Sequence, residues 1–387
     1  MQQKKTLTFF EASSIVTGFG VGGGIMAVPY LASLTGLSVF FVLLVSAYLL
    51  SMLIHLMIAE TLMHESSSSQ LVELFSRYLF RGKGGFIFTW VFFVLIILAF
   101  YANLSAYLAG GGEIIAELTG APVWIGHCIT YAVAAGVVFF GLKAVGISEK
   151  YAVIAMLICV GVLSVATLLK PFSLDFVVKG TMNEGLALFG MIMFAFSALF
   201  SVPQAVEGLH WNRKLAPKAV ILGMGINLFI TLIITVMVTG ISTEVTRVAM
   251  IGWGRAIGDW AFIFGNLFIL LALLTSYWAI SFALAVVFNE RLKLGDRVSW
   301  LCATLPTLVI VLAQFTDFIG FMGIAGSAIA LLVAILVVPT MRGARKYGDV
   351  KNPEWTLGFF GNTFFQVGVI IGFIITAIGS AIIPSIR

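Results

Sequence analysis

The chain has 387 residues, of which 60% are hydrophobic and only 10% are charged. Soluble domains have roughly 45–50% apolar and about 25% charged residues, so this composition excludes a cytosolic enzyme, a nucleic-acid-binding protein and a disordered chain. The net charge of +5 does not alter this conclusion, because the cations lie in short segments between apolar runs rather than in one basic patch. We expect an integral membrane protein whose partners are the lipid bilayer and a small substrate, with no nucleic acid.

Apolar runs long enough to cross a bilayer follow one another along the whole chain. The uncharged run 38–59 would form a helix about 33 Å long, against a hydrocarbon core of roughly 30 Å. Transmembrane β-strands would need an alternating pattern that is absent, so only helices satisfy the backbone in lipid. The sequence therefore predicts an all-α membrane protein with eleven transmembrane helices, at 8–32, 37–61, 86–112, 122–143, 149–169, 184–209, 217–241, 257–289, 298–315, 317–340 and 357–383.

The positions of Lys and Arg predict the orientation, because cytoplasmic loops carry an excess of these residues. If the N-terminus is cytoplasmic, 17 of the 22 cations fall in cytoplasmic segments and five in segments on the external side of the membrane: Lys170, Lys179, Arg247, Arg255 and Arg387. We therefore expect a multi-pass protein of the plasma membrane or bacterial inner membrane, with its N-terminus inside and its C-terminus outside.

The first predicted span is interrupted by glycine. Five glycines fall among the seven residues from Gly18 to Gly24, and each glycine costs about 1 kcal/mol in a soluble helix. We expect an unwound stretch here, which survives in the middle of a membrane only where it lines a cavity. The alternative is that the glycines form a packing face for a neighbouring helix.

The sixth span repeats a feature of the first. A shift of 174 residues places Val202-Pro203 on Val28-Pro29. Interrupted segments at matching positions in two halves indicate a transporter, because inverted repeats bring the two breaks together at the midplane. We predict a five-plus-five inverted repeat with helices 1 and 6 broken and one helix added, divided into residues 1–170, 180–341 and 352–387.

Two stretches carry a resemblance to a known family. They are GGGIMAVPYLASLTG at 22–36 and MIMFAFSALFSVPQAVEGLHWNRKLAPKAV at 191–220, and both resemble the amino acid/auxin permease family of the APC superfamily. The eleven helices and the inside N-terminus are also those of that family. The resemblance implies a secondary active transporter that imports an amino acid by alternating access, and it excludes an enzyme.

An amino acid needs donors for its carboxylate and acceptors for its ammonium group, and a broken helix supplies both. The amides of Gly22, Gly23 and Gly24 would begin the second half-helix, where the positive end of the helix dipole suits a carboxylate. Carbonyls near Phe19, Phe194 and Ser197 would accept from the ammonium group. The remaining candidates are Ala198, which leaves room for a side chain, and Tyr101, which either donates to the carboxylate or bonds a neighbouring helix.

The adjacent hydroxyls of Thr275 and Ser276 lie in an otherwise apolar run. They resemble the sodium motif of the wider superfamily, and the resemblance implies a five-oxygen cage for one Na+. Its oxygens would be the hydroxyls of that pair and three carbonyls: Thr17, Gly20 and Ala272. Alternatively, both hydroxyls bond back to carbonyls one turn earlier. A second Na+ is not expected, because Gly24 stands where such a site would need Asn.

The competing interpretations concern the coupling ion and whether the protein transports its ligand or has another function. Proton-coupled relatives often carry an ionisable group on the fifth span, and residues 151–169 hold none, which favours Na+. If the ion is a proton, His55 and Glu207 are the candidate relays. A membrane amino-acid sensor would use the same fold. A channel would need rings of charged residues and a membrane enzyme would need clustered histidines, and this sequence has neither. We expect a functional monomer, with the substrate open from alanine to an aromatic amino acid.

Overall fold

The computed structural model describes residues 6–66, 69–80, 84–242, 245–246, 248–314 and 336–382. Within these ranges the regular structure is helical, and no strand is present. The elements are α1 Phe9–Gly20, α2 Gly23–Thr35, α3 Leu37–Met63, α4 Leu71–Tyr78, α5 Gly85–Thr119, α6 Val123–Phe139, α7 Leu142–Leu168, α8 Met182–Ala195, α9 Ser201–Gly208, α10 Leu215–Ile241, α11 Ala249–Ile257, α12 Asp259–Leu292, α13 Asp296–Leu312, η2 Gly358–Gly361 and α15 Thr363–Ile382.

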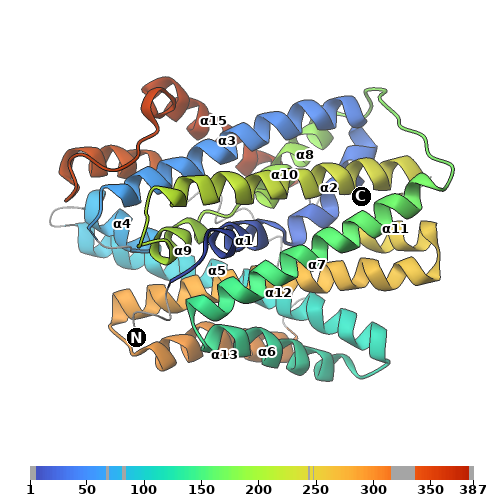
Figure 1. Ribbon diagram of the computed structural model, residues 1–387, viewed down its shortest axis with the longest axis horizontal. Helices are drawn as coiled ribbons and strands as arrows, with labels where there is room; N and C mark the ends of the chain where they lie inside the picture. Colours follow the sequence, from blue (N-terminus) through green and yellow to red (C-terminus); the bar gives the residue numbers. More distant parts are fainter. Residues whose placement is uncertain are drawn as a thin grey trace.

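The helices form a bundle whose long members run side by side across Figure 1. Within the described residues, six helices are long and apolar enough to cross a membrane, and α1 with α2 forms one further bent span. The shorter helices α6, α8 and α13 occupy the predicted fourth, sixth and ninth spans. The predicted all-α membrane fold is confirmed. Most of the predicted tenth span, 317–340, lies outside the described residues, and 336–347 is helical.

The first span is broken within the glycine run, as predicted. Helix α1 ends at Gly20, α2 begins at Gly23, and the two helices are bent by 54°. Gly22 adopts an extended conformation, with φ −122° and ψ −152°. The start of α1 is fixed by a capping box, in which Thr8 and Glu11 satisfy each other's backbone amides. The chain therefore unwinds for two residues and continues in a new direction.

The sixth span is also broken, over a longer stretch. Helix α8 ends at Ala195 and α9 begins at Ser201, so residues 196–200 leave backbone groups without helical partners. Side chains of α3 meet two of them: Ser51 Oγ donates to the Phe196 carbonyl, and the Ala198 amide donates to His55 Nε2, each at 3.0 Å. The second break is therefore held by a neighbouring helix.

The two broken spans lie at the centre of the bundle. Helix α1 packs against α7, α9, α10 and α12, and α2 packs against α8 and α10. Glycine permits these close approaches, because a β-carbon on Gly24 would lie 2.9 Å from the Ala195 amide nitrogen and 2.8 Å from Phe194 Cδ1. The glycine run thus serves both as a break and as a packing face, the two roles that the sequence left open.

A polar network ties the elements together at the end of the bundle that holds α4 (Figure 1). Arg77 pairs with Glu65, and with Asp349 at 2.6 Å. Arg213 donates to the Glu65 carbonyl at 2.8 Å. Burial raises the pKa of the Glu65 carboxyl, against the lowering effect of Tyr78 and Arg77. These contacts join the end of α3, α4, the segment around residue 349 and the segment between α9 and α10 that holds Arg213.

Candidate functional site

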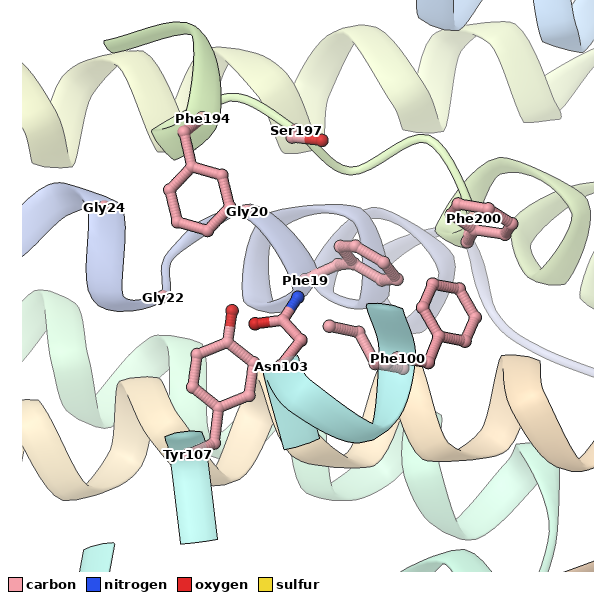
Figure 2. A pocket seen from close by; sticks show the side chains of 11 residues that line it. Phe19, Gly20, Gly22, Gly24, Phe100, Asn103, Tyr107, Phe194, Ser197 and Phe200 are labelled. Carbon is pink, nitrogen blue, oxygen red and sulfur yellow. The ribbon is translucent and has the colours of Figure 1, made fainter. Parts of the chain in front are cut away.

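A small cavity lies between the two breaks (Figure 2). Its volume is about 20 Å³, which is room for about one water molecule. The lining comes from α1, α2, α5, α12 and the segment around the second break. The lining residues are Phe19, Gly20, Gly22, Gly24, Phe100, Asn103, Tyr107, Phe194, Ser197, Phe200 and Ile280.

Five of the predicted substrate residues line this cavity: Phe19, Gly22, Gly24, Phe194 and Ser197. The amide of Gly22 is already used, because it donates to the Gly20 carbonyl at 2.8 Å. Gly23 and Gly24 open α2, and the first amides of a helix have no acceptor within it. The donors that the break leaves for a carboxylate are therefore these two amides.

Of the other predicted substrate residues, Gly23 begins α2 but is not among the residues that line the cavity, and Ala198 and Tyr101 lie apart from it. Ala198 is fully buried, and its amide is bonded to His55. The Tyr101 hydroxyl donates to the Cys302 carbonyl on α13 at 2.6 Å. Of the two predicted roles, it therefore has the one in which it bonds a neighbouring helix. Neither residue lines the space between the breaks. Glu207, a predicted proton relay, lies on α9 and does not line it either.

Two polar side chains that the sequence analysis missed reach the cavity from α5. Figure 2 shows the hydroxyl of Tyr107 and the amide of Asn103 directed towards the first break. A β-carbon on Gly22 would lie 3.0 Å from the Tyr107 hydroxyl. Phe100, Asn103 and Tyr107 are spaced as one face of a helix, and this spacing is the signal in the sequence that could have identified them.

Four phenylalanines form most of the apolar wall: Phe19, Phe100, Phe194 and Phe200. The rings of Phe100 and Phe200 meet edge to face, with centroids 4.6 Å apart. Aromatic rings favour this geometry with one another. The site thus combines polar groups at the first break with a wall suited to an apolar side chain.

The hydroxyl pair on α12 lies against the first break. Ser276 Oγ donates to the Gly18 carbonyl at 3.1 Å and to the Val21 carbonyl at 3.4 Å. Thr275 Oγ1 donates to the Ala272 carbonyl one turn earlier, at 3.0 Å. The span-one carbonyls beside the pair are therefore each one residue beyond the predicted Thr17 and Gly20.

The Thr17 and Gly20 carbonyls accept backbone hydrogen bonds instead. They take the amides of Val21 and Gly22 respectively, each at 2.8 Å. The Thr17 hydroxyl donates to the Gly223 carbonyl at 3.1 Å, so this residue joins α1 to α10. Spacing along the sequence could not set this register, because it depends on where the helix unwinds.

A buried carboxylate lies beside the same hydroxyl pair. Glu149 on α7 is fully buried, and its carboxylate packs so closely on Gly18 that a methyl group there would overlap it. That methyl group would also lie 2.9 Å from Thr275 Cβ. Glu149 is the first residue of the predicted fifth span, 149–169, but the prediction considered only residues 151–169 and so missed this carboxylate, which lies well inside α7 (Leu142–Leu168). The argument for Na+ from a lack of charge on that span is therefore wrong.

Three solved structures have a similar fold. Over 97% of this chain and 99% of the other, the fold matches MhsT in complex with L-phenylalanine, with a TM-score of 0.68 and 15% identity. MHP1, a nucleobase-cation-symport-1 family transporter, matches with a TM-score of 0.68 and 15% identity, over 100% of this chain and 93% of the other. The Eremococcus coleocola manganese transporter matches with a TM-score of 0.62 and 13% identity, over 96% of this chain and 85% of the other. At these identities the likeness shows the fold.

Curated relatives have names that indicate amino-acid transport. The tyrosine-specific transport system 1 of Haemophilus influenzae is 23% identical over 393 residues, covering 95% of each chain. Glutamine transporter 2 of Aliivibrio fischeri is 23% identical over 355 residues, covering 86% of this chain and 89% of the relative.

The family comparison covers nearly the whole sequence. Residues 5–379 match the model of the tryptophan/tyrosine permease family. An amino-acid permease was expected from the two matching stretches, whereas the narrower amino acid/auxin permease family remains an expectation. Together with the fold and the relatives, this match identifies a membrane transporter rather than an enzyme. The chain belongs to the tryptophan/tyrosine permease family.

Proposed function

We propose that this protein imports an amino acid by alternating access and binds it between the two helix breaks. The amides of Gly23 and Gly24 and the Tyr107 hydroxyl would hold the carboxylate. Carbonyls near Phe19, Phe194 and Ser197 would accept from the ammonium group. The observation that carries this proposal is that residues from both breaks line one cavity.

The substrate class that we propose is an amino acid with an aromatic side chain. The four phenylalanines of the cavity wall support it, because aromatic rings pair favourably edge to face. The family description and the tyrosine-specific relative support it as well. A cavity of about 20 Å³ is much too small for such a substrate, so its walls must move apart for the substrate to bind.

We propose Na+ as the coupling ion, bound where α12 meets the first break. The cage would use the hydroxyls of Thr275 and Ser276 and the Ala272 carbonyl, with Gly18 and Val21 replacing the predicted Thr17 and Gly20. Oxygen donors of this kind suit a hard cation. A proton is the second candidate, because the Glu149 carboxyl lies beside the same oxygens.

One ion is sufficient to drive accumulation. Entry of one cation supplies about 2.3 kcal/mol per 100 mV of membrane potential, and a tenfold inward gradient adds about 1.4 kcal/mol. The total of about 3.7 kcal/mol corresponds to a concentration ratio of several hundred for a neutral substrate.

The predicted topology completes the proposal. The N-terminus would be cytoplasmic and the C-terminus external, with inverted repeats at 1–170 and 180–341, an added helix in 352–387, and a functional monomer. Single cysteines placed in the exposed loop at Phe176 and at Lys351 would react with a membrane-impermeant maleimide only from outside and only from inside, respectively. The opposite labelling would reverse the orientation.

Uptake into proteoliposomes tests both the function and the ion. Radiolabelled tyrosine, tryptophan, phenylalanine and glutamine are offered with Na+ or choline outside, at fixed pH and membrane potential. We expect accumulation of an aromatic amino acid that depends on Na+, and Thr275→Ala is expected to reduce the Na+-dependent part at least tenfold. Full Na+-dependent uptake by that variant would exclude the proposed cage, and no uptake of any of these four amino acids by the wild type would contradict the proposed import of an aromatic amino acid and favour the amino-acid sensor.

A further inference from the structure

The carboxylate of Glu149 lies in an environment that normally excludes charge. The residue is fully buried, and within the described part of the chain neither of its carboxylate oxygens has a hydrogen-bond partner. Burial of a carboxylate without a partner is strongly unfavourable, so such groups are paired, bound to a cation or protonated. Intramembrane carboxylates of this kind mark ion pathways in transporters.

The cationic side chains near Glu149 are engaged elsewhere. Lys143, two turns earlier on α7, pairs with Glu11 of α1 at 2.6 Å. Lys150 follows Glu149 directly, but its ammonium group lies over the ring of Tyr151 at 4.7 Å from the centroid. Within the described residues Glu149 forms no ion pair and its carboxylate oxygens accept no hydrogen bond, so a cation that neutralises it would come from solution.

Gly18 connects the carboxylate with the oxygens around Ser276. Its carbonyl accepts from Ser276 Oγ at 3.1 Å, and the face where a side chain would begin is covered by the Glu149 carboxylate and by Thr275. The carboxylate from α7, the carbonyls of the first break and the hydroxyls from α12 therefore lie around one residue. Any side chain at Gly18 would fill the space that they share.

We propose that Glu149 binds the coupling cation and supplies the negative charge of that site. This inference rests on the proposed function and adds a carboxylate to the five neutral oxygens proposed there, from Gly18, Val21, Ala272, Thr275 and Ser276. One carboxylate among neutral oxygens matches a monovalent cation, and both Na+ and H+ provide that chemistry. With the cation bound, the site is neutral and can change its exposure from one side of the membrane to the other.

The test separates coupling from substrate movement. Wild type and Glu149→Gln are reconstituted and given an inward Na+ gradient at equal pH, or an inward proton gradient without Na+. A third arm measures counterflow exchange of labelled for unlabelled substrate without any gradient. We expect the wild type to accumulate substrate in one gradient arm, which identifies the cation. Glu149→Gln should accumulate at least tenfold less in both, yet exchange within about twofold of the wild type, because a neutral side chain imitates the cation-bound state.

Several results would overturn the inference. Concentrative uptake by Glu149→Gln at the wild-type level shows that the carboxylate does not bind the coupling cation. Loss of exchange in a monodisperse, substrate-binding variant shows that it is needed for movement rather than for coupling. If Glu149→Gln does not fold, Glu149→Asp replaces it: the shortened carboxylate should keep accumulation but raise the half-saturating cation concentration at least threefold, and an unchanged value rejects the inference.

A matched control and the wild type keep this result distinct from the proposed function. Glu117→Gln removes an exposed carboxylate on α5 and should leave accumulation in each arm unchanged. If the wild type exchanges substrate but accumulates none under either gradient, the inference fails while amino-acid transport stands. If the wild type neither accumulates nor exchanges any amino acid, the proposed function itself fails.

Discussion

The two helix breaks differ in what contacts their exposed backbone groups. The first is two residues long, lies in a glycine run and has backbone groups that face the cavity between the breaks and the hydroxyls of α12. The second is five residues long, contains no glycine, and is held by Ser51 and His55 of α3. A further contact joins α9 to α12, where Gln204 donates to the Ala279 carbonyl at 2.8 Å.

This difference indicates a division of labour. Glycine allows other groups to approach the first break closely and leaves polar groups there for a ligand. Side chains from a neighbouring helix satisfy much of the second break, which makes it a fixed wall. Substitutions at the first break should therefore affect coupling and binding, whereas those behind the second break should affect stability as well.

The largest effect is expected at Gly18. In Gly18→Ala the new methyl group would overlap the Glu149 carboxylate and approach Thr275, and overpacking of this kind costs about 1–3 kcal/mol. We expect gradient-driven uptake in proteoliposomes to fall at least tenfold. Gly136→Ala on α6 is the control, since a β-carbon there meets nothing within 4 Å. Normal coupled uptake by Gly18→Ala would show that a methyl group is accommodated between Gly18, Glu149 and Thr275, which contradicts this prediction.

A smaller effect is expected behind the second break, at His55. Because Nε2 accepts from the Ala198 amide, Nδ1 carries the proton and donates to the Ser51 carbonyl at 2.6 Å. His55→Ala removes the side-chain acceptor of the buried Ala198 amide, which keeps its contact with the Phe196 carbonyl at 3.1 Å, so the cost is that of one hydrogen bond, about 0.5–1.5 kcal/mol. We expect a lower melting temperature together with weaker substrate binding.

The control for this prediction is His210→Ala, an exposed histidine whose recorded contact is with the nearby Glu207 carbonyl. It should melt like the wild type. If His55→Ala also keeps the wild-type melting temperature and substrate affinity, α3 does not hold the second break, and the contrast between the two breaks disappears.

The narrowest effect, confined to substrate affinity, is expected from a single hydroxyl at the first break. Tyr107→Phe removes the donor that we assign to the substrate carboxylate, and a hydrogen bond to a charged group contributes about 1.5–3 kcal/mol. The KM for uptake should rise at least about tenfold. Tyr101→Phe removes only the bond to the Cys302 carbonyl and should leave KM unchanged. Equal KM values for Tyr107→Phe and the wild type would remove Tyr107 from the site.

The sequence predicted the large features because they depend on local chemistry. Five glycines in seven residues have few structural explanations, so the first break could be placed from the sequence. The repeated Val-Pro pair placed the second break at the correct span, and Pro203 in the first turn of α9 has no amide with which to bond the Leu199 carbonyl inside the break. Its support from Ser51 and His55 is a tertiary contact with no signal in the local sequence.

The finer features depend on rotation and register, which the pattern of apolar runs leaves undetermined. Tyr101 and Tyr107 lie on the same helix, and only the packing of α5 shows which one faces the break. Glu149 stands at the edge of a predicted span, where a charged residue is usually solvated, yet the helix begins seven residues earlier and buries it. The exact unwinding point likewise decides which carbonyls face Ser276.

The most direct test of the account is an experimental structure of the protein with the amino acid that it accumulates. We predict ligand density between the two breaks, with the carboxylate at the amides of Gly23 and Gly24 and the side chain among Phe19, Phe194 and Phe200. Density at any other place, or first and sixth spans that run through the membrane as continuous helices, would contradict it.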